Sequence, residues 1–328
     1  MELLKHINTI LDQYKNDKQL NNILVAVSGG IDSLALTFLV NEYAKNHNIK
    51  FHALTIDHQL RPESTIEAKE LNKLLSKHNI NHSILTWHHQ EPINSNIEAK
   101  ARNARYELIA NFSTQNNIDL TLIGHHFDDQ IENFFIRLER GSGVDGLGLM
   151  DTTFVRNNTK FLRPLLNIQK KQLHQYLVSR EIKWLDDSSN QDEKFKRNKI
   201  RNLIEQLENK ELIKKRIYQT SKHLSRAKSY LNIQTEATYE ELVNFNNSKA
   251  EINLNAFKKL HEEIAFRLMI KLFNKIGDKA YKPRFEKLEI LYEKIINDQI
   301  NKSSTFANCL IEITQNKMML SKEITRNK

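Results

Sequence analysis

The sequence predicts an α/β protein with a doubly wound parallel sheet, followed by a second, mainly helical C-terminal domain. Short aliphatic segments alternate with helix-forming segments along the first 205 residues, and this alternation is typical of a parallel sheet covered by helices on both faces. The chain has 328 residues, enough for two domains with a core each. We expect a first domain over residues 1–205, a basic helical connector over 206–245 and a smaller domain over 246–328.

The first strand is the most strongly marked element of the sheet. Residues 23–27 are five consecutive aliphatic residues, the pattern of a strand buried on both faces. Further strands are expected at 51–56, 83–87 and 120–123, and helices at 3–20, 34–43, 65–78, 96–106 and from the fourth strand through Arg140. The remainder predicts a long helical stretch over 205–243, helices over 256–276 and 285–296, and a strand pair within 304–320.

Composition excludes several classes of protein. Hydrophobic residues make up 39 % and charged residues 27 % of the chain, and no apolar run is long enough to span a membrane. Cys309 is the single cysteine, which excludes an internal disulfide and a cysteine-clustered zinc or iron–sulfur site within one chain. We expect a cytoplasmic protein with no membrane partner, and we leave a homodimer open.

The net charge of +9 is concentrated in one segment. Residues 1–205 carry 26 basic and 25 acidic side chains, whereas residues 194–228 carry twelve basic and three acidic ones. A nucleic acid backbone is the obvious partner for such a segment. The alternative interpretation is a solvated helix face.

A phosphate-binding turn follows the first strand. The sequence there is Ser-Gly-Gly-Ile-Asp-Ser, and a helix-forming run begins directly after it. Glycines let the backbone turn and approach a phosphate closely, and the start of a helix favours negative charge. The turn lacks the Gly-Lys-Ser/Thr ending of a Walker loop and the third glycine of a dinucleotide fingerprint. Its candidate nucleotide-binding residues are Ser28, Gly29, Gly30, Ile31, Asp32 and Ser33, and Asp32 is the candidate ligand of a Mg²⁺ ion carried in with the nucleotide.

Further polar clusters stand near the ends of the predicted strands, where ligands bind in such sheets. His125 follows the fourth strand, and Asp129 and Glu132 are three residues apart on the next helix, so they share a face. Two arginine pairs, Arg102 with Arg105 and Arg197 with Arg201, also fall on one helix face each. The alternative interpretation of the acidic pair, which we would prefer if it stood alone, is an exposed acidic helix face. The alternative interpretation of the arginines is surface ion pairs or charge that keeps the protein soluble.

These motifs resemble those of a known family. The turn is similar to the PP-loop of the ATP pyrophosphatases, whose fold is that of the adenine nucleotide alpha hydrolases. The wider pattern resembles the tRNA(Ile)-lysidine synthetase family over nearly all of the first 205 residues, in motifs at 58–64, 96–106, 124–132, 140–147, 163–166, 187–190 and 197–201. One position departs from the family pattern, because Asn133 stands where a threonine is usual. Longer relatives carry two modules after the first domain.

The resemblance implies a two-step ligation on a tRNA(Ile) with a CAU anticodon. The C2 carbonyl oxygen of the wobble cytidine attacks the α-phosphate of ATP and releases pyrophosphate, and the ε-amine of L-lysine then attacks C2 and displaces AMP to leave lysidine. The implied catalytic residues are Asp32, His125, Asp129 and Arg197, although the sequence does not choose between His125 and His126. Asp129 and Glu132 would bind lysine, Arg102, Arg105 and Arg201 would contact tRNA, and residues 246–328 would form a tRNA-binding domain.

Three other functions are weighed against this one. A tRNA thiolase of the PP-loop group needs clustered cysteines, which one cysteine does not supply. An NAD or GMP synthetase does not bind a nucleic acid, so this function would not explain the basic segment. An RNA-binding protein with an inactive nucleotide fold would have no need of Asp32.

Overall fold

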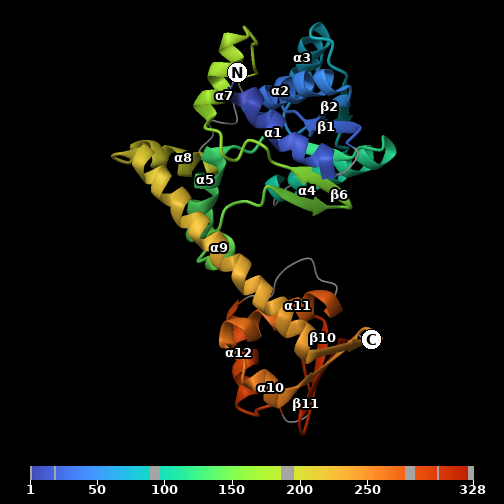
Figure 1. Cartoon of the computed structure of the whole chain (residues 1–328), viewed down its shortest axis with the longest axis vertical. Helices are drawn as coiled ribbons and strands as arrows, with labels where there is room; N and C mark the ends of the chain where they lie inside the picture. Colours follow the sequence, from blue (N-terminus) through green and yellow to red (C-terminus); the bar gives the residue numbers. More distant parts are fainter. Residues whose placement is uncertain are drawn as a thin grey trace. The chain divides into compact units, whose positions relative to one another are not determined.

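The chain folds into two compact units, residues 1–222 and 223–328 (Figure 1). The computed structural model describes residues 2–17, 20–88, 97–185, 196–277, 285–300 and 303–323. Each unit has its own hydrophobic core. The division into a catalytic domain, a connector and a tRNA-binding domain stays a prediction.

The first unit is built on a six-stranded sheet in the order β3-β2-β1-β4-β6-β5. Its strands are β1 Asn22–Ala26, β2 Lys50–Asp57, β3 His82–Thr86, β4 Leu120–Ile123, β5 Thr153–Arg156 and β6 Thr159–Leu162. Neighbouring strands are parallel except for β5, which pairs antiparallel with β6 at one edge. The four predicted strands are therefore confirmed, and the β5–β6 hairpin is an addition that the sequence analysis did not predict.

Helices cover both faces of this sheet, as expected for a doubly wound fold. The helices of the first unit are α1 Glu2–Asp17, α2 Ile31–His47, α3 Ser64–Lys77, α4 Ile97–Gln115, α5 Phe127–Leu138, α6 Val144–Leu147, α7 Lys170–Ser179 and α8 Lys196–Gln206, and α9 Lys210–Leu242 begins in this unit and ends in the second. The larger core lies between the sheet and α1, α2, α3 and α7. A smaller core on the other face packs Tyr106 and Ile109 of α4 against Leu24, Leu54 and Phe161.

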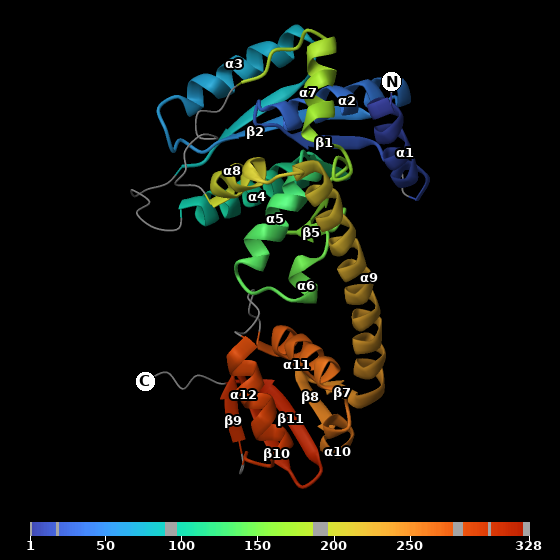
Figure 2. The same ribbon diagram turned by 90° about the vertical axis from the view of Figure 1, so that its left-hand side faces the viewer.

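The second unit contains an antiparallel sheet of five strands in the order β7-β8-β11-β10-β9 (Figure 2). Its elements after α9 are β7 Val243–Asn246, β8 Lys249–Asn253, α10 Leu254–Lys258, α11 Glu262–Gly277, α12 Phe285–Ile296, β9 Ser303–Phe306, β10 Cys309–Thr314 and β11 Lys317–Lys322. Phe257, Phe273 and Cys309 are fully buried in its core. The helix over 285–296 is confirmed, the helix expected over 256–276 is broken between α10 and α11, and the expected strand pair belongs to a larger sheet.

Membrane-spanning helices and groups of metal-binding side chains are both absent from the described part of the chain. None of its helices combines the length and the apolar character needed to cross a lipid bilayer. The same residues contain no group of three or more histidine, cysteine, aspartate or glutamate side chains arranged to hold a metal ion.

Candidate functional site

The phosphate-binding turn lies at the carboxyl edge of the sheet, between β1 and α2. Gly29 has φ +88°, a conformation that side chains other than glycine rarely adopt. The backbone N–H of Ser28 donates to Ser33 Oγ at 3.1 Å, and Ser33 Oγ donates to the Gly30 carbonyl at 3.2 Å. Ser28 is exposed. The turn is therefore braced from within and open to a ligand.

The turn opens into a cavity of about 390 Å³, which we name the nucleotide cavity. Its apolar lining includes Leu54, Ile56, Ile109 and Ile123, and its charged lining includes Asp32, Arg105, Asp129, Arg197 and Arg201. An apolar wall next to convergent cations suits a ligand that has a flat base and several phosphates. The cavity also contains Ser28, Gly30, Ser33 and His125, so it brings together most of the residues that the sequence predicted.

Asp32 is held by a histidine that the sequence analysis left undecided. The His126 ring is buried, its Nε2 lies 3.2 Å from Asp32 Oδ2, and its Nδ1 accepts from the Asp128 backbone N–H at 3.2 Å. These two contacts are satisfied together when the neutral ring carries its proton on Nε2. The other Asp32 oxygen, Oδ1, is buried and has no hydrogen-bond partner in the described structure. That oxygen fits the role of a ligand for Mg²⁺, which prefers carboxylate oxygens.

His126 also caps α5. Its side chain accepts a hydrogen bond from the Asp128 backbone N–H in the first turn of the helix. Its own backbone N–H donates to Asp129 Oδ2 at 2.9 Å, which completes a capping box. Asp129 is buried and lies 3.5 Å from Arg197 NH1. Burial opposes ionisation of Asp129, but the neighbouring His126 ring, the Arg197 guanidinium and the hydrogen bond from the His126 backbone N–H outweigh it and lower the pKa of the carboxyl group. Asp129 is therefore an anion at neutral pH.

His125, the predicted catalytic histidine, is in the nucleotide cavity. Burial lowers the pKa of its imidazole to about 3, opposed by Asp129 and assisted by nearby arginines. The ring is therefore neutral at pH 7. Its Nδ1 is buried and without a hydrogen-bond partner among the described residues, which leaves it available to a bound substrate.

Glu132 forms a pair that the sequence analysis did not anticipate. Arg201 Nε donates to Glu132 Oε1 at 2.5 Å and Arg201 NH2 donates to Oε2 at 3.3 Å. Burial raises the pKa of Glu132, although Arg201 acts against this shift. Arg197 and Arg201 of α8 thus face Asp129 and Glu132 of α5, and each acidic residue predicted for lysine already has an arginine neighbour.

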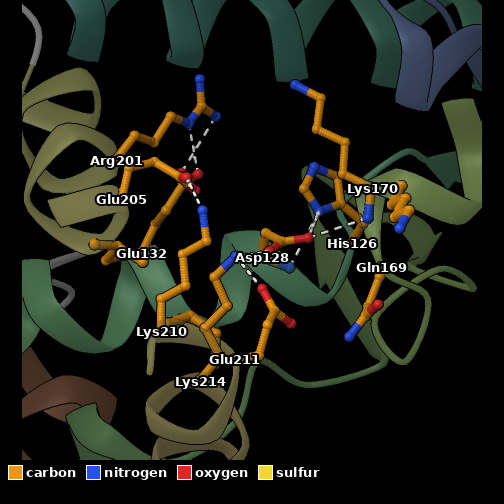
Figure 3. A pocket seen from close by; sticks show the side chains of 13 residues that line it. His126, Asp128, Glu132, Gln169, Lys170, Arg201, Glu205, Lys210, Glu211 and Lys214 are labelled. Carbon is orange, nitrogen blue, oxygen red and sulfur yellow. Dashed lines mark hydrogen bonds and ion pairs between the residues drawn. The ribbon is translucent and has the colours of Figure 1, made fainter. Parts of the chain in front are cut away.

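A second cavity of about 690 Å³ lies beside α5 (Figure 3). Glu132 and His126 line it, Asp129 lines the nucleotide cavity, and Arg201 lines both. Lys214 Nζ of α9 donates to Asp128 Oδ1 at 2.9 Å, and the Lys170 backbone N–H at the start of α7 donates to Asp128 Oδ2 at 3.0 Å. The first turns of α5 therefore stand between the two cavities.

The remaining predicted residues are divided between the cavity and its surroundings. Arg105 lines the nucleotide cavity, whereas Arg102 is exposed and stacks on Tyr106. His58 also lines the cavity, and burial lowers its pKa to about 4, so it is neutral at pH 7. His58 belongs to the motif at 58–64, but it was not among the residues predicted for the site. The motif at 187–190 lies outside the described residues, and the Leu185 N–H just before it donates to the Gly29 carbonyl at 3.0 Å.

Comparisons with known proteins show which family the chain resembles. A family model described as the PP-loop domain matches residues 3–208. The tRNA(Ile)-lysidine synthase of Wolbachia pipientis wMel is 38 % identical over 308 residues, which cover 93 % of this chain and 72 % of the relative. The synthase of the same name from Orientia tsutsugamushi (strain Boryong) is 35 % identical over 315 residues, 93 % of this chain and 70 % of the relative.

One solved structure supports the fold alone. The U34-tRNA thiolase NcsA from Methanococcus maripaludis, with its 4Fe–4S cluster, superimposes with a TM-score of 0.53 at 20 % sequence identity. The match covers 62 % of this chain and 73 % of the thiolase.

Proposed function

This chain belongs to the PP-loop domain family and, within it, to the tRNA(Ile)-lysidine synthases, and on that premise we propose that it ligates L-lysine to C2 of the wobble cytidine of tRNA(Ile). The tRNA would carry a CAU anticodon, and ATP would activate the cytidine. The observation that carries the proposal is the placement of α5 between the two cavities, with Asp129 in one and Glu132 in the other. This placement suits a reaction that joins two substrates.

The nucleotide cavity would bind MgATP. The backbone and hydroxyl donors of the turn, from Ser28 through Ser33, suit the phosphates. Asp32 Oδ1, buried and without a partner in the described structure, would hold Mg²⁺. MgATP supplies an activated α-phosphate and a charge-neutralised pyrophosphate leaving group.

The first step would be attack of the cytidine C2 carbonyl oxygen on the α-phosphate, with loss of pyrophosphate. Negative charge grows on the phosphate oxygens during this step, so fixed cations stabilise it. Arg105 and Arg197 line the cavity, and they would be the cations that stabilise this charge. Neutral His125 can form hydrogen bonds to the substrate without adding another charge.

The second step would be attack of the lysine ε-amine on C2, with loss of AMP. Asp129 and Glu132, three residues apart on α5, would orient the amine from the two cavities that they line. The second cavity offers lysine a way to Glu132 that does not pass through the nucleotide. Arg102, Arg105 and Arg201 stay proposed contacts of tRNA, and we place the reaction in the cytoplasm.

The test is incubation of the purified chain with tRNA(Ile) transcript, ATP and radiolabelled lysine. We expect lysine to be incorporated into the transcript, and we expect no incorporation when uridine replaces the wobble cytidine. Asp32→Ala should be inactive, because the variant loses the proposed Mg²⁺ ligand. Absence of lysine incorporation by the unaltered protein, or an active Asp32→Ala variant, would defeat the proposal.

A further inference from the structure

Four arginines converge on one aromatic cluster beside the nucleotide cavity. The guanidinium carbons of Arg102, Arg105 and Arg156 lie 5.2, 5.5 and 4.3 Å from the centre of the Tyr106 ring. Arg163 lies 4.1 Å from the centre of Phe154. The rings of Tyr106 and Phe154 contact each other edge to face at 5.9 Å. We name Arg102, Arg105, Arg156 and Arg163 the arginine cluster.

Among the described residues, few groups compensate the charge of the arginine cluster. In the part of the chain that the structure describes, none of the four makes an ion pair within 4.0 Å of a carboxylate oxygen. Three of the arginines donate hydrogen bonds to neutral acceptors: Arg102 to the Tyr106 hydroxyl, Arg156 to the Asn103 amide oxygen and Arg163 to the Asp151 backbone carbonyl. The Asp151 carboxylate attracts Arg163 from a greater distance.

Two further observations indicate that the arginine cluster contains unsatisfied donors and like charges that repel each other. The Nε groups of Arg105 and Arg163 are buried without a hydrogen-bond partner among the described residues, and each such group is costly to leave unsatisfied. Partial desolvation lowers the pKa of Arg102 although the residue is exposed. Attraction from Tyr106 opposes this shift, and repulsion from Arg105, Arg197 and Arg156 adds to it. An anion placed on the cluster would relieve both costs.

Arg180 also stacks on a tyrosine, but it differs from the arginine cluster because it has a carboxylate partner. Arg180 lies 5.2 Å from the centre of the Tyr176 ring, but its NH2 also pairs with Glu42 Oε2 at 2.9 Å. Stacking on an aromatic ring therefore does not by itself leave an arginine without a carboxylate partner in this fold. Among the described residues, the four members of the arginine cluster have no carboxylate partner of the kind that Arg180 has.

We propose that the arginine cluster binds the phosphodiester backbone of the tRNA whose cytidine enters the nucleotide cavity. The inference rests on the proposed function and adds Arg156 and Arg163, on the β5–β6 hairpin and the residue after it, to the RNA-binding surface. Arg105 belongs both to the cluster and to the nucleotide cavity, so the surface is continuous with the site where the base would react. A bound strand could reach the cavity without leaving the cluster.

The chemistry of the cluster suits an RNA backbone. Guanidinium groups bind phosphates with two parallel hydrogen bonds, and the aromatic faces hold the groups in place before binding. Several cations spread over α4 and the hairpin would meet successive phosphates, whereas a single small anion would meet one or two. Each phosphate contact contributes a log–log salt slope of about 0.7–0.9, which corresponds to about a 5- to 8-fold gain in affinity at 0.1 M salt relative to 1 M.

The test compares Arg156→Gln with Arg180→Gln. Both substitutions remove an arginine that stacks on tyrosine, and only the first belongs to the cluster. We expect Arg156→Gln to weaken binding of tRNA(Ile) transcript about 5- to 8-fold at 0.1 M KCl and to lower the salt slope by about 1. Arg180→Gln should bind tRNA like the unaltered protein. Arg156→Lys, which keeps the charge, should retain the slope.

Two controls separate this inference from the proposed function. Thermal unfolding should show that both variants are folded, and ATP binding measured by calorimetry should be unchanged in both. Equal tRNA affinity and salt slope for Arg156→Gln and the unaltered protein would overturn the inference even if lysine is incorporated normally. Weakened ATP binding with unchanged tRNA binding would overturn it as well, because the cluster would then serve the nucleotide. Failure of lysine incorporation alone would defeat only the proposed function.

Discussion

His126 shows how one buried side chain connects the turn after β1 with α5. Its Nδ1 caps the helix and its Nε2 contacts Asp32, the proposed Mg²⁺ ligand. The sequence identified both histidines of the motif but could not rank them, because neither pattern nor spacing tells which ring points into the cavity and which is buried. His125 lines the nucleotide cavity, and His126 supports Asp32 from behind.

The two contacts of His126 can be separated by substitution. Asparagine is among the best helix caps, so His126→Asn should keep the cap while losing the contact with Asp32. We expect its free energy of unfolding to stay within about 1 kcal/mol of the unaltered protein, while the KM for MgATP rises severalfold. His126→Ala, which loses both contacts, should be destabilised by about 0.5–2 kcal/mol. Denaturant unfolding and steady-state kinetics measure these effects, and an unchanged KM in His126→Asn would contradict the supporting role.

At the scale of elements, strong local patterns were predictable and long-range pairings were not. The aliphatic run of β1 and the glycine turn identified the sheet and its ligand edge. The β5–β6 hairpin was missed although Asn157 and Asn158 at its turn, both with positive φ, are a known signal of a tight hairpin. The pairing of α8 with α5 through Arg201 and Glu132 could not be predicted, because 69 residues separate the two side chains along the chain.

A histidine network at the sheet edge makes a further prediction about stability. His82 of β3 bonds to Thr55 and Asn72, and burial, assisted by His52, lowers its pKa to about 4 from 6.5. The unfolded chain therefore binds more protons at this residue between these two pH values, and stability present above pH 6.5 is lost as the pH falls toward 4.

The substitution His82→Asn should remove this contribution. We expect the variant to be less stable at pH 7, because it loses buried hydrogen bonds, and to lose less of its melting temperature than the unaltered protein between pH 7 and pH 5. Thermal unfolding followed by circular dichroism at both pH values measures the difference. The substitution of the exposed His88 by asparagine is the matched control. If both variants showed the same pH dependence of the melting temperature as the unaltered protein, His82 would not be the source of the predicted loss of stability.

At the scale of the whole molecule, the sequence predicted the net positive charge and the segment that carries most of it. It did not predict which of these cations form ion pairs. Within the basic segment, Arg201 and Lys214 are committed to Glu132 and Asp128. Several other cations of α9 are exposed: Lys215, Arg216, Lys222 and Arg226. The Arg156 and Arg163 members of the arginine cluster lie far from the segment in sequence, and a count of charge along the chain therefore overlooked them.

The exposed cations of α9 give a prediction about RNA binding. Replacement of Lys215, Arg216, Lys222 and Arg226 by glutamine should weaken tRNA binding and lower its salt slope, because fewer counterions are released from the RNA. Filter binding at several KCl concentrations measures the slope. ATP binding should stay unchanged, since none of the four lines the nucleotide cavity. A slope equal to that of the unaltered protein would return these residues to the solvated-face interpretation.

The buried position of Cys309 has a practical consequence. The chain's single thiol is 0 % exposed in the core of the second unit, and a buried thiol is inert until the surrounding structure opens. A thiol-specific reagent added to the native protein would therefore be consumed at the rate at which this one core opens. The reaction of Cys309 with such a reagent therefore reports how often the core of residues 223–328 opens, and no cysteine has to be introduced for the measurement.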